Sequence, residues 1–312
     1  MIRLTGFEIV SKREMFKMSK RLLFIYNPFS GKGLIKRHLP DIIDIMVKKG
    51  YDVTTYPTQA REDGMRKAKL EAANYDRIVC SGGDGTLDEV MTGVMQSGVD
   101  VPIGYIPAGS TNDFANSLKI PKDMPKAAVV AAGDHAFACD IGDFNGDTFV
   151  YVAAFGLFTE VSYQTSQQMK NILGHVAYIL EGIKHLADIP SFMMQVEYNG
   201  NIIQDKFIYG MVTNSISVGG FKGITGDDVK LDDGVFEVTL IKSPRNPIEL
   251  NQILRSLTSR SDETDMIYTF KSNELKFTTN KPVPWTLDGE FGGEHTELLV
   301  KNLNKRVQIM VP

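Results

Sequence analysis

Residues 76–91, DRIVCSGGDGTLDEVM, decide the fold of this chain. An apolar run that ends at Cys80 indicates a strand, and Leu87 and Val90 then recur at helical spacing. The helix is expected to begin near Thr86, so that the glycines form the turn between strand and helix. Such a turn directs backbone N–H groups and the positive end of a helix toward one point, which favours anion binding.

Asp84 makes this turn unusual, because a carboxylate repels phosphate groups unless a cation bridges them. Mg²⁺ accepts hard oxygen ligands and keeps some of its waters, so Asp84 predicts magnesium beside a bound phosphate. Gly82, Gly83 and Gly85 lack the Cβ atoms that would block a phosphate from approaching the backbone. The alternative is a plain glycine-rich turn in which Asp84 caps the helix.

The same alternation of strand and helix extends to both sides of this stretch. Strands are expected at 21–27, 51–56 and 101–107, and helices at 35–46 and 62–74. Strands that alternate with helices predict a parallel sheet that is covered on both faces.

The pattern changes after about residue 138. Asn145-Gly146 and Asn199-Gly200 each separate two strand-like runs, and Asn-Gly is the strongest short hairpin signal. Helical periodicity is confined to a run from Ile172 to Leu186 and to residues 247–259. The second half is therefore predicted to be mostly antiparallel β, and the strand 306–311 can pair with either half. Large apolar residues of this half are expected to be core rather than pocket: Phe149, Tyr151, Phe155, Phe158, Met193 and Met194.

Composition limits the classes of protein that fit. The 312 residues are 43% hydrophobic and 23% charged, which indicates a globular chain of about two domains. A net charge of -4 argues against a nucleic-acid partner. Two cysteines, Cys80 and Cys139, exclude a secreted disulfide framework and favour a reducing cytoplasm. No apolar run approaches the roughly 20 residues that span a bilayer.

The first residues are basic. Residues 1–21 carry six Lys and Arg side chains against two Glu, so this arm is able to touch an anionic membrane. The alternative is a disordered extension without a partner. Met18 directly precedes the first expected strand and is a candidate for the true start, which leaves open whether residues 1–17 belong to the native protein.

Two further polar loops follow strands of the predicted parallel sheet. Residues 26–33, YNPFSGKG, offer hydroxyl, amide and ammonium donors, although they do not form the GxxxxGK[ST] phosphate loop. Residues 106–118, IPAGSTNDFANSL, place four polar side chains in a row; helix capping by Thr111 or Asn112 is the plain alternative. Because parallel strands end at one edge, the three loops predict a nucleotide crevice there.

Four motifs together resemble the soluble bacterial diacylglycerol kinase family, whose catalytic domain is shared with sphingosine kinases. They are NPFSGKG, GGDGTLDEV, GSTNDFANSL and LDGE, and the resemblance runs from about Lys20 to the last residues. It implies an α/β fold of two domains. The first would be a nucleotide-binding α/β domain with a parallel sheet of the NAD-kinase/phosphofructokinase type, and the second a mostly antiparallel, β-sandwich-like domain. The implied divisions are an extension 1–19, an ATP-binding domain 20–137, a lipid-substrate domain 138–298, and a strand 299–312 that returns to the first domain.

The resemblance also implies an activity. A member of this family would use ATP and Mg²⁺ to phosphorylate a lipid hydroxyl, with diacylglycerol as the first choice of acceptor and phosphatidic acid as product. It would be cytoplasmic, would meet its lipid at the inner membrane face, and would pair as a homodimer in some members. Three alternatives stay open: another lipid acceptor such as phosphatidylglycerol or a sphingoid base, an NAD kinase, which also uses GGDGT, and a lipid sensor without catalysis.

Carried over residue by residue, the resemblance implies three sets of roles. Glu290 resembles the general base, and Asp84 and Asp113 would organise the catalytic Mg²⁺ and its waters. A structural Mg²⁺ would use backbone oxygens of Lys230 and Val235 and the carboxylate of Asp233. The residues expected to bind ATP or to stand near its phosphates are Asn27, Pro28, Phe29, Ser30, Gly31, Lys32, Arg37, Thr58, Gly82, Gly83, Asp84, Gly85, Thr86, Leu87, Asp88 and Ser110.

The sequence departs from the family pattern at two positions, and the LDGE segment allows an alternative interpretation. Ser110 stands where the family often has Thr, and it keeps the hydroxyl. Asn116 stands where the family commonly has Arg, which removes a cation near the proposed site. On its own, the LDGE segment also fits a turn with an exposed acid, and nearby Trp285 suggests local packing.

Overall fold

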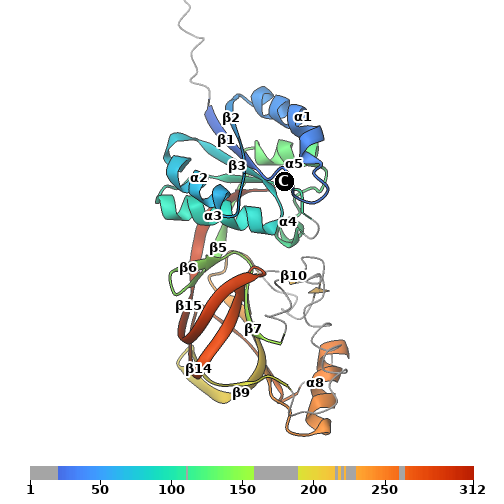
Figure 1. Cartoon of the computed structure of the whole chain (residues 1–312), viewed down its shortest axis with the longest axis vertical. Helices are drawn as coiled ribbons and strands as arrows, with labels where there is room; N and C mark the ends of the chain where they lie inside the picture. Colours follow the sequence, from blue (N-terminus) through green and yellow to red (C-terminus); the bar gives the residue numbers. More distant parts are fainter. Residues whose placement is uncertain are drawn as a thin grey trace, which may run out of the picture.

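The computed structural model describes residues 20–109, 112–157, 189–214, 217–218, 221–222, 230–259 and 264–312. Thirteen of the strands in these residues form one sheet that runs through two domains (Figure 1). The expected extension 1–19 and the expected helix from Ile172 to Leu186 lie outside the described residues, as does Phe158. None of the described helices is long and apolar enough to cross a membrane.

The first domain contains a parallel sheet in the order β2-β1-β3-β4, as the alternation of strands and helices predicts. Helix α1 packs against α5 and α2 against α3, and the two pairs lie on opposite sides of the sheet (Figure 1). The strands are β1 (Lys20–Tyr26), β2 (Tyr51–Pro57), β3 (Arg77–Gly82) and β4 (Ile103–Pro107). The helices are α1 (Ile35–Lys48), α2 (Asp63–Glu71), the 3-10 turn η2 (Ala72–Asn74), α3 (Asp84–Ser97), α4 (Asp113–Ser117) and α5 (Met124–Ala131).

Helices on both faces bury the central strands completely. The four consecutive residues from Leu22 to Ile25 in β1 are fully buried, and so are those from Ile78 to Ser81 in β3. A strand that is covered on both sides has no solvent face, which explains why these segments read as continuous apolar runs without alternation. Cys80 belongs to this buried set, so it is a core residue, as the sequence indicates.

The second domain is mostly antiparallel, as expected. Its strands are β5 (Ala136–Phe144), β6 (Asp147–Phe149), β7 (Val152–Gly156), β8 (Phe192–Tyr198), β9 (Asn201–Thr213), β12 (Phe236–Lys242), β13 (Ile267–Ser272), β14 (Glu274–Leu287) and β15 (Glu290–Met310). β10 (Ser217–Val218) and β11 (Phe221–Lys222) form a separate two-stranded sheet. Helix α8 (Pro247–Ser259) has the predicted bounds.

Both predicted Asn-Gly hairpins are present. Asn145 and Gly146 have φ of 53° and 91° between β5 and β6, and Asn199 and Gly200 have φ of 47° and 77° between β8 and β9. Positive φ at both central residues is the requirement of the type I′ turn, which matches the twist of antiparallel strands. The sequence signal therefore fixes both the place and the kind of turn.

Strands β7 and β8 share one strand position. Both pair with β9 on one side and with β14 on the other, and both run antiparallel to these neighbours. The chain leaves this line after Gly156 and rejoins it at Phe192. Gly156 has a φ of 93°, and a Cβ there would overlap the carbonyl oxygen of Ile208, so the exit requires glycine.

An aromatic cluster fills the second domain. The Trp285 ring lies 4.8 Å from Phe155, 5.1 Å from Phe277 and 5.3 Å from Phe144, measured between ring centroids. Trp285 is therefore a packing residue, as its sequence position suggests. One expectation is wrong: Met193 is 48% exposed, because alternate residues of β8 face outward while its neighbour Met194 faces the core.

β15 connects the two domains. Its first part pairs with β14, its later part pairs with β5, and Ile309 pairs in parallel with Ile103 of β4 (Figure 1). The strands of the second domain are thus hydrogen-bonded without a break to the sheet of the first domain. β5 also begins beside the first domain, since Phe137 pairs with Ile309.

Candidate functional site

The three polar loops meet at the carboxyl edge of the parallel sheet. The backbone N–H of Asn27 donates to Ser81 O (2.8 Å), which joins the first loop to the glycine-rich turn. The N–H of Ala108 donates to Gly82 O (2.7 Å), which joins the third loop to the same turn. A Cβ at Gly31 would overlap the carbonyl oxygen of Ala108, so the first and third loops also pack directly on each other.

The helix of the glycine-rich turn begins earlier than the sequence predicts. Helix α3 starts at Asp84, with Gly83 as its N-cap, whereas the apolar spacing suggested a start near Thr86. Asp84 therefore lies in the first turn, where the positive helix end favours a carboxylate. Leu87 is 1% exposed and faces the core, so this member of the predicted ATP-binding set packs inward.

The glycines of this turn have different roles. A Cβ at Gly82 would overlap the side chain of Thr86, so Gly82 is required by packing within the protein. A Cβ at Gly83 would meet nothing closer than Gly109 Cα at 3.6 Å, and one at Gly85 nothing closer than Glu290 Oε1 at 3.8 Å. Only Gly83 and Gly85 therefore leave the open backbone that was expected of all three.

We expect Gly82→Ala and Gly83→Ala to separate folding from nucleotide binding. The methyl group at Gly82 overpacks the turn, which should lower the free energy of unfolding by about 1–3 kcal/mol. Gly83 has an ordinary φ of -81°, so its alanine variant should be as stable as the wild type but should raise the KM for ATP. Denaturant titration and ATP-dependent kinetics measure the two effects. Equal losses of stability in both variants would contradict this division.

Glu290 enters the site on a tight hairpin between β14 and β15. Asp288 and Gly289 have φ of 50° and 91°, a third type I′ turn. The Asp288 carboxylate accepts the backbone N–H groups of Val150, Tyr151 and Val152 at 2.6, 3.0 and 2.8 Å. The Tyr151 hydroxyl donates to the Asp288 carbonyl oxygen at 3.0 Å. The Asp288 N–H also donates to Val152 O (2.8 Å), so five hydrogen bonds of Asp288 hold the turn and fix the place of Glu290.

A cleft of about 420 Å³ lies between the loops and this hairpin. It brings together seven of the predicted ATP-binding residues and the predicted base: Asn27, Phe29, Ser30, Thr58, Gly83, Gly85, Thr86 and Glu290. It also includes four residues that the sequence did not single out: Gln59, Ala60, Arg61 and Glu89. The glycine-rich turn and the acid of the other domain therefore face a single cavity.

Several predicted residues do not line this cleft. Lys32 and Arg37 are exposed outside it, although they were expected near the phosphates. Pro28, Gly31, Gly82, Asp84, Leu87 and Asp88 are likewise absent from its lining. Ser110 lies outside the described residues, as does the side chain of Asp113, whose backbone begins α4. Asn116 is exposed on the same short helix.

Arg61 is the cation that the structure places in the cleft. It lies in the loop between β2 and α2 and forms an ion pair with Glu290. The signal in the sequence was its position, since this loop follows a strand of the parallel sheet, as the other three loops do. Its pairing with an acid of the second domain has no local signal.

Glu89 was also missed, and it orders the loop that carries Arg61. Its two carboxylate oxygens accept the backbone N–H groups of Glu62 (2.8 Å) and Gly64 (3.1 Å) at the start of α2. Burial raises the pKa of Glu89, while these two hydrogen bonds act in the opposite direction. Glu89 is therefore a structural acid at the wall of the cleft.

Negative charge is concentrated beside the cleft. Burial raises the pKa of Asp288 to about 7, and the nearby carboxylate of Asp84 also acts to raise it. The three backbone N–H groups that donate to Asp288 act in the opposite direction. Burial and then the carboxylate of Asp288 raise the pKa of Asp88 well above its usual range. The Oδ1 atom of Asp88 is buried and has no hydrogen-bond partner among the described residues. This unpartnered carboxylate oxygen is a hard ligand of the kind that a divalent cation accepts.

The second predicted magnesium site, at Lys230, Asp233 and Val235, lies in a segment where the Asp233 carboxylate already has partners within the protein. Lys230 is exposed, and the Asp233 carboxylate accepts the N–H of Val235 (3.3 Å) and lies 3.8 Å from the ammonium of Lys271. In the part of the chain that the structure describes, no group of three or more His, Cys, Asp and Glu side chains can hold a metal ion. A site of backbone oxygens does not need such a group, so this second site stays a prediction.

Comparisons with known proteins agree on one family. Residues 21–144 match the family model of the diacylglycerol kinase catalytic domain. Over 299 residues the chain is 34% identical to a diacylglycerol kinase of Staphylococcus carnosus (strain TM300), covering 95% of this chain and 96% of the relative. The identity to a diacylglycerol kinase of Staphylococcus aureus (strain JH9) is also 34%, covering 95% and 93%. A crystal structure of a diacylglycerol kinase from Bacillus anthracis str. Sterne shares the fold, with a TM-score of 0.74, 21% identity and coverage of 94% and 97%.

Proposed function

The chain belongs to the diacylglycerol kinase family and is a lipid kinase, and on this basis we propose that it transfers the γ-phosphate of ATP to the hydroxyl of diacylglycerol, giving phosphatidic acid. The observation that carries the proposal is the single cleft that contains both the glycine-rich turn and Glu290. Gly83 and Gly85 offer open backbone at the positive end of α3, which suits a triphosphate. We also propose the NAD-kinase/phosphofructokinase type for the first domain, which the parallel order β2-β1-β3-β4 supports.

The chemistry follows from the two sides of the cleft. The lipid hydroxyl oxygen attacks the γ-phosphorus while the bond from that phosphorus to the bridging oxygen of ADP breaks. Glu290, on the opposite wall, accepts the hydroxyl proton as the new bond forms. The turn at Asp288 holds Glu290 in place, so the acid is positioned before the substrate arrives. Phe291 is 55% exposed beside it and offers an apolar surface to the acceptor.

Magnesium fits the carboxylates near the triphosphate. The Oδ1 atom of Asp88 is buried without a hydrogen-bond partner among the described residues, and an oxygen of this kind is a ligand that Mg²⁺ accepts. Asp84 and Asp113 would hold the ion through its waters. When bound, Mg²⁺ would offset charge on the phosphates.

A labelled-transfer experiment tests the proposed function. The purified chain, ATP labelled in the γ-phosphate and Mg²⁺ are mixed with diacylglycerol, phosphatidylglycerol, sphingosine or NAD in parallel, and products are identified by mass. We expect transfer to diacylglycerol and no transfer when Mg²⁺ is chelated. Transfer to NAD would favour the NAD kinase alternative, and absence of transfer to any lipid would support a non-catalytic sensor. Transfer to another lipid would keep the enzyme class and correct the substrate.

The place of action and the assembly are part of the same proposal. We propose a cytoplasmic enzyme that touches the inner membrane face, because its acceptor resides in the bilayer. Binding to vesicles that contain diacylglycerol checks the membrane contact. A homodimer is proposed from family resemblance, and the mass of the protein in solution checks it.

A further inference from the structure

Arg61 has a place in the cleft that the mechanism above does not use. Among the described lining residues it is the one cation, and Glu89 and Glu290 are the two acids. A triphosphate in this cleft would therefore meet repulsion from two carboxylates and attraction from one guanidinium. The planar guanidinium donates two parallel N–H groups to phosphate oxygens, a geometry that an ammonium lacks.

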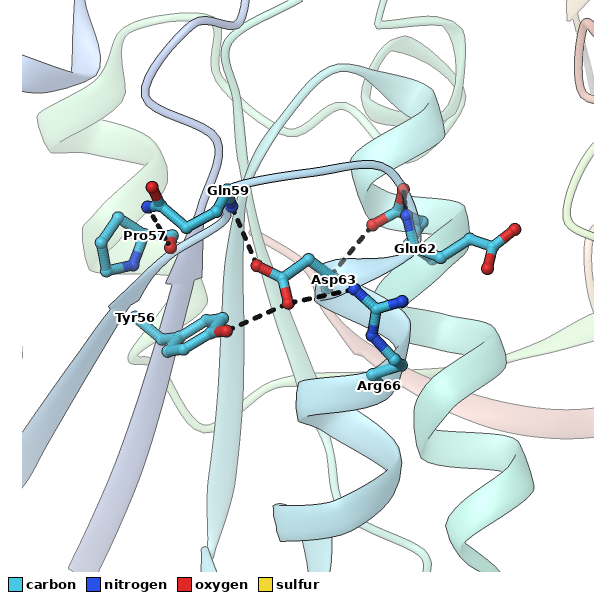
Figure 2. Close-up of polar contacts among 8 residues, drawn as sticks. Tyr56, Pro57, Gln59, Glu62, Asp63 and Arg66 are labelled. Carbon is cyan, nitrogen blue, oxygen red and sulfur yellow. Dashed lines mark hydrogen bonds and ion pairs between the residues drawn. The ribbon is translucent and has the colours of Figure 1, made fainter.

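The loop that carries Arg61 is held by hydrogen bonds on its N-terminal side. The N–H of Thr58 donates to Tyr26 O (2.9 Å) of the neighbouring strand. The Asp63 carboxylate accepts the Tyr56 hydroxyl at 3.0 Å and the N–H of Gln59 at 2.8 Å (Figure 2). These bonds hold the residues that precede Arg61 against the sheet and the first turn of α2.

Hydrogen bonds also hold the loop on the C-terminal side of Arg61. Glu62 has a φ of 63°, a left-handed conformation, and its N–H donates to the carboxylate of Glu89. The N–H of Gly64 donates to the other oxygen of the same carboxylate. With the backbone held on both sides, the side chain of Arg61 is the part that can change partner.

The partner of Arg61 in this structure belongs to the other domain. Its guanidinium pairs with Glu290, the acid on the β14–β15 hairpin. The two side chains are 70% and 51% exposed, so the pair contributes little to stability and is easily exchanged for another partner. While it lasts, the pair engages the carboxylate that must accept a proton.

We propose that Arg61 exchanges partners when ATP binds: it leaves Glu290 and contacts the terminal phosphate, which frees Glu290 to act as base. The proposal rests on the function proposed above, since it takes Glu290 as that base. ATP can cause the exchange only because its terminal phosphate interacts with Arg61 in one arrangement and not in the other. ADP lacks that phosphate and leaves Arg61 on Glu290, so the contact reports which nucleotide is bound.

Calorimetry with Mg²⁺ and either ATP or ADP tests the exchange without lipid and without turnover. Arg61→Gln should weaken ATP binding roughly tenfold to hundredfold, the loss expected for a charge-assisted hydrogen bond, and should leave ADP binding nearly unchanged. Arg61→Lys should recover part of the loss. The matched control is Arg66→Gln, because Arg66 pairs with Asp63 within the first domain and does not line the cleft.

The second arm uses the other member of the pair. Glu290→Gln should strengthen ATP binding about twofold to fivefold, since Arg61 no longer has to leave an ion pair. In a chain that already carries Arg61→Gln, the same change should have no effect on ATP binding. Additive effects of the two changes, or equal losses of ATP and ADP binding in Arg61→Gln, would overturn the exchange.

The proposed function and this inference fail in different ways. If the wild type transfers phosphate to no lipid, or if Glu290→Gln keeps full turnover, the proposed function fails. If the wild type is active and Arg61→Gln behaves like Arg66→Gln in binding both nucleotides, only the exchange fails.

Discussion

Replacing Glu290 by Gln is expected to reduce kcat by about 10²–10⁴-fold, the usual contribution of a positioned general base. The amide keeps the size of the side chain and its hydrogen-bonding reach but cannot take the proton of the lipid hydroxyl. Because Glu290 is half exposed and its ion pair with Arg61 lies in solvent, the free energy of unfolding should change little. Loss of turnover without loss of stability is thus the expected combination.

The matched control for this change is Glu294→Gln. Glu294 lies farther along β15, and it does not line the cleft. Its variant should retain the turnover of the wild type with diacylglycerol. Steady-state rates and denaturant titrations of the two variants decide the matter, and near-normal turnover of folded Glu290→Gln would refute its role as base.

Asp84→Asn is the second change for which a large effect is expected. The carboxylate at the start of α3 is proposed to hold the waters of the catalytic Mg²⁺, so its loss should lower kcat by about 10²–10³-fold, as removal of a key electrostatic group does. The variant should also require a higher concentration of Mg²⁺ for half-maximal rate. Rates measured over a series of MgCl₂ concentrations provide both quantities.

The free energy of unfolding should change little for Asp84→Asn, in contrast to the rate. Burial raises the pKa of Asp288, and the nearby charge of Asp84 adds to this shift, as expected for two carboxylates that repel each other. A neutral amide at this position would remove that repulsion but also the attraction between the carboxylate and the positive end of α3, so the free energy of unfolding without Mg²⁺ should change by less than about 1 kcal/mol. The control is Asp52→Asn, an exposed residue of β2, which should change neither rate nor magnesium dependence. A variant that loses much more than about 1 kcal/mol of unfolding free energy would contradict this account of Asp84.

Local chemistry explains why much of the fold was predictable. Both Asn-Gly turns, the bounds of α8 and the alternation of strands and helices that predicts a parallel sheet depend on residues close together in the chain. The start of α3 was misplaced by two residues because its first turn contains Asp84 and Gly85, which carry no apolar signal. At Asp288-Gly289 the sequence allowed a turn with an exposed acid as the alternative to a catalytic acid, and the structure has this turn directly before Glu290.

The site was less predictable because it depends on contacts between distant segments. Glycine at position 82 signalled a phosphate loop, yet its packing partner is Thr86. Lys32 and Arg37 stood near a motif in sequence, whereas the cation in the cleft is Arg61 from another loop. The pairing of Arg61 with Glu290 and the common line of β7 and β8 require the register of the whole sheet, which no short pattern contains.

The route of β15 has a consequence for biosynthesis. Residues near Ile103 leave the ribosome long before Ile309. The edge of β4 that later pairs with β15 therefore stays unpaired while most of the chain is still being synthesised. The first domain cannot complete its sheet as an independent early unit, and the nascent polypeptide depends on late residues to cover that edge. A premature stop codon upstream of residue 307 would therefore damage the nucleotide-binding half, although every residue of its loops had been translated.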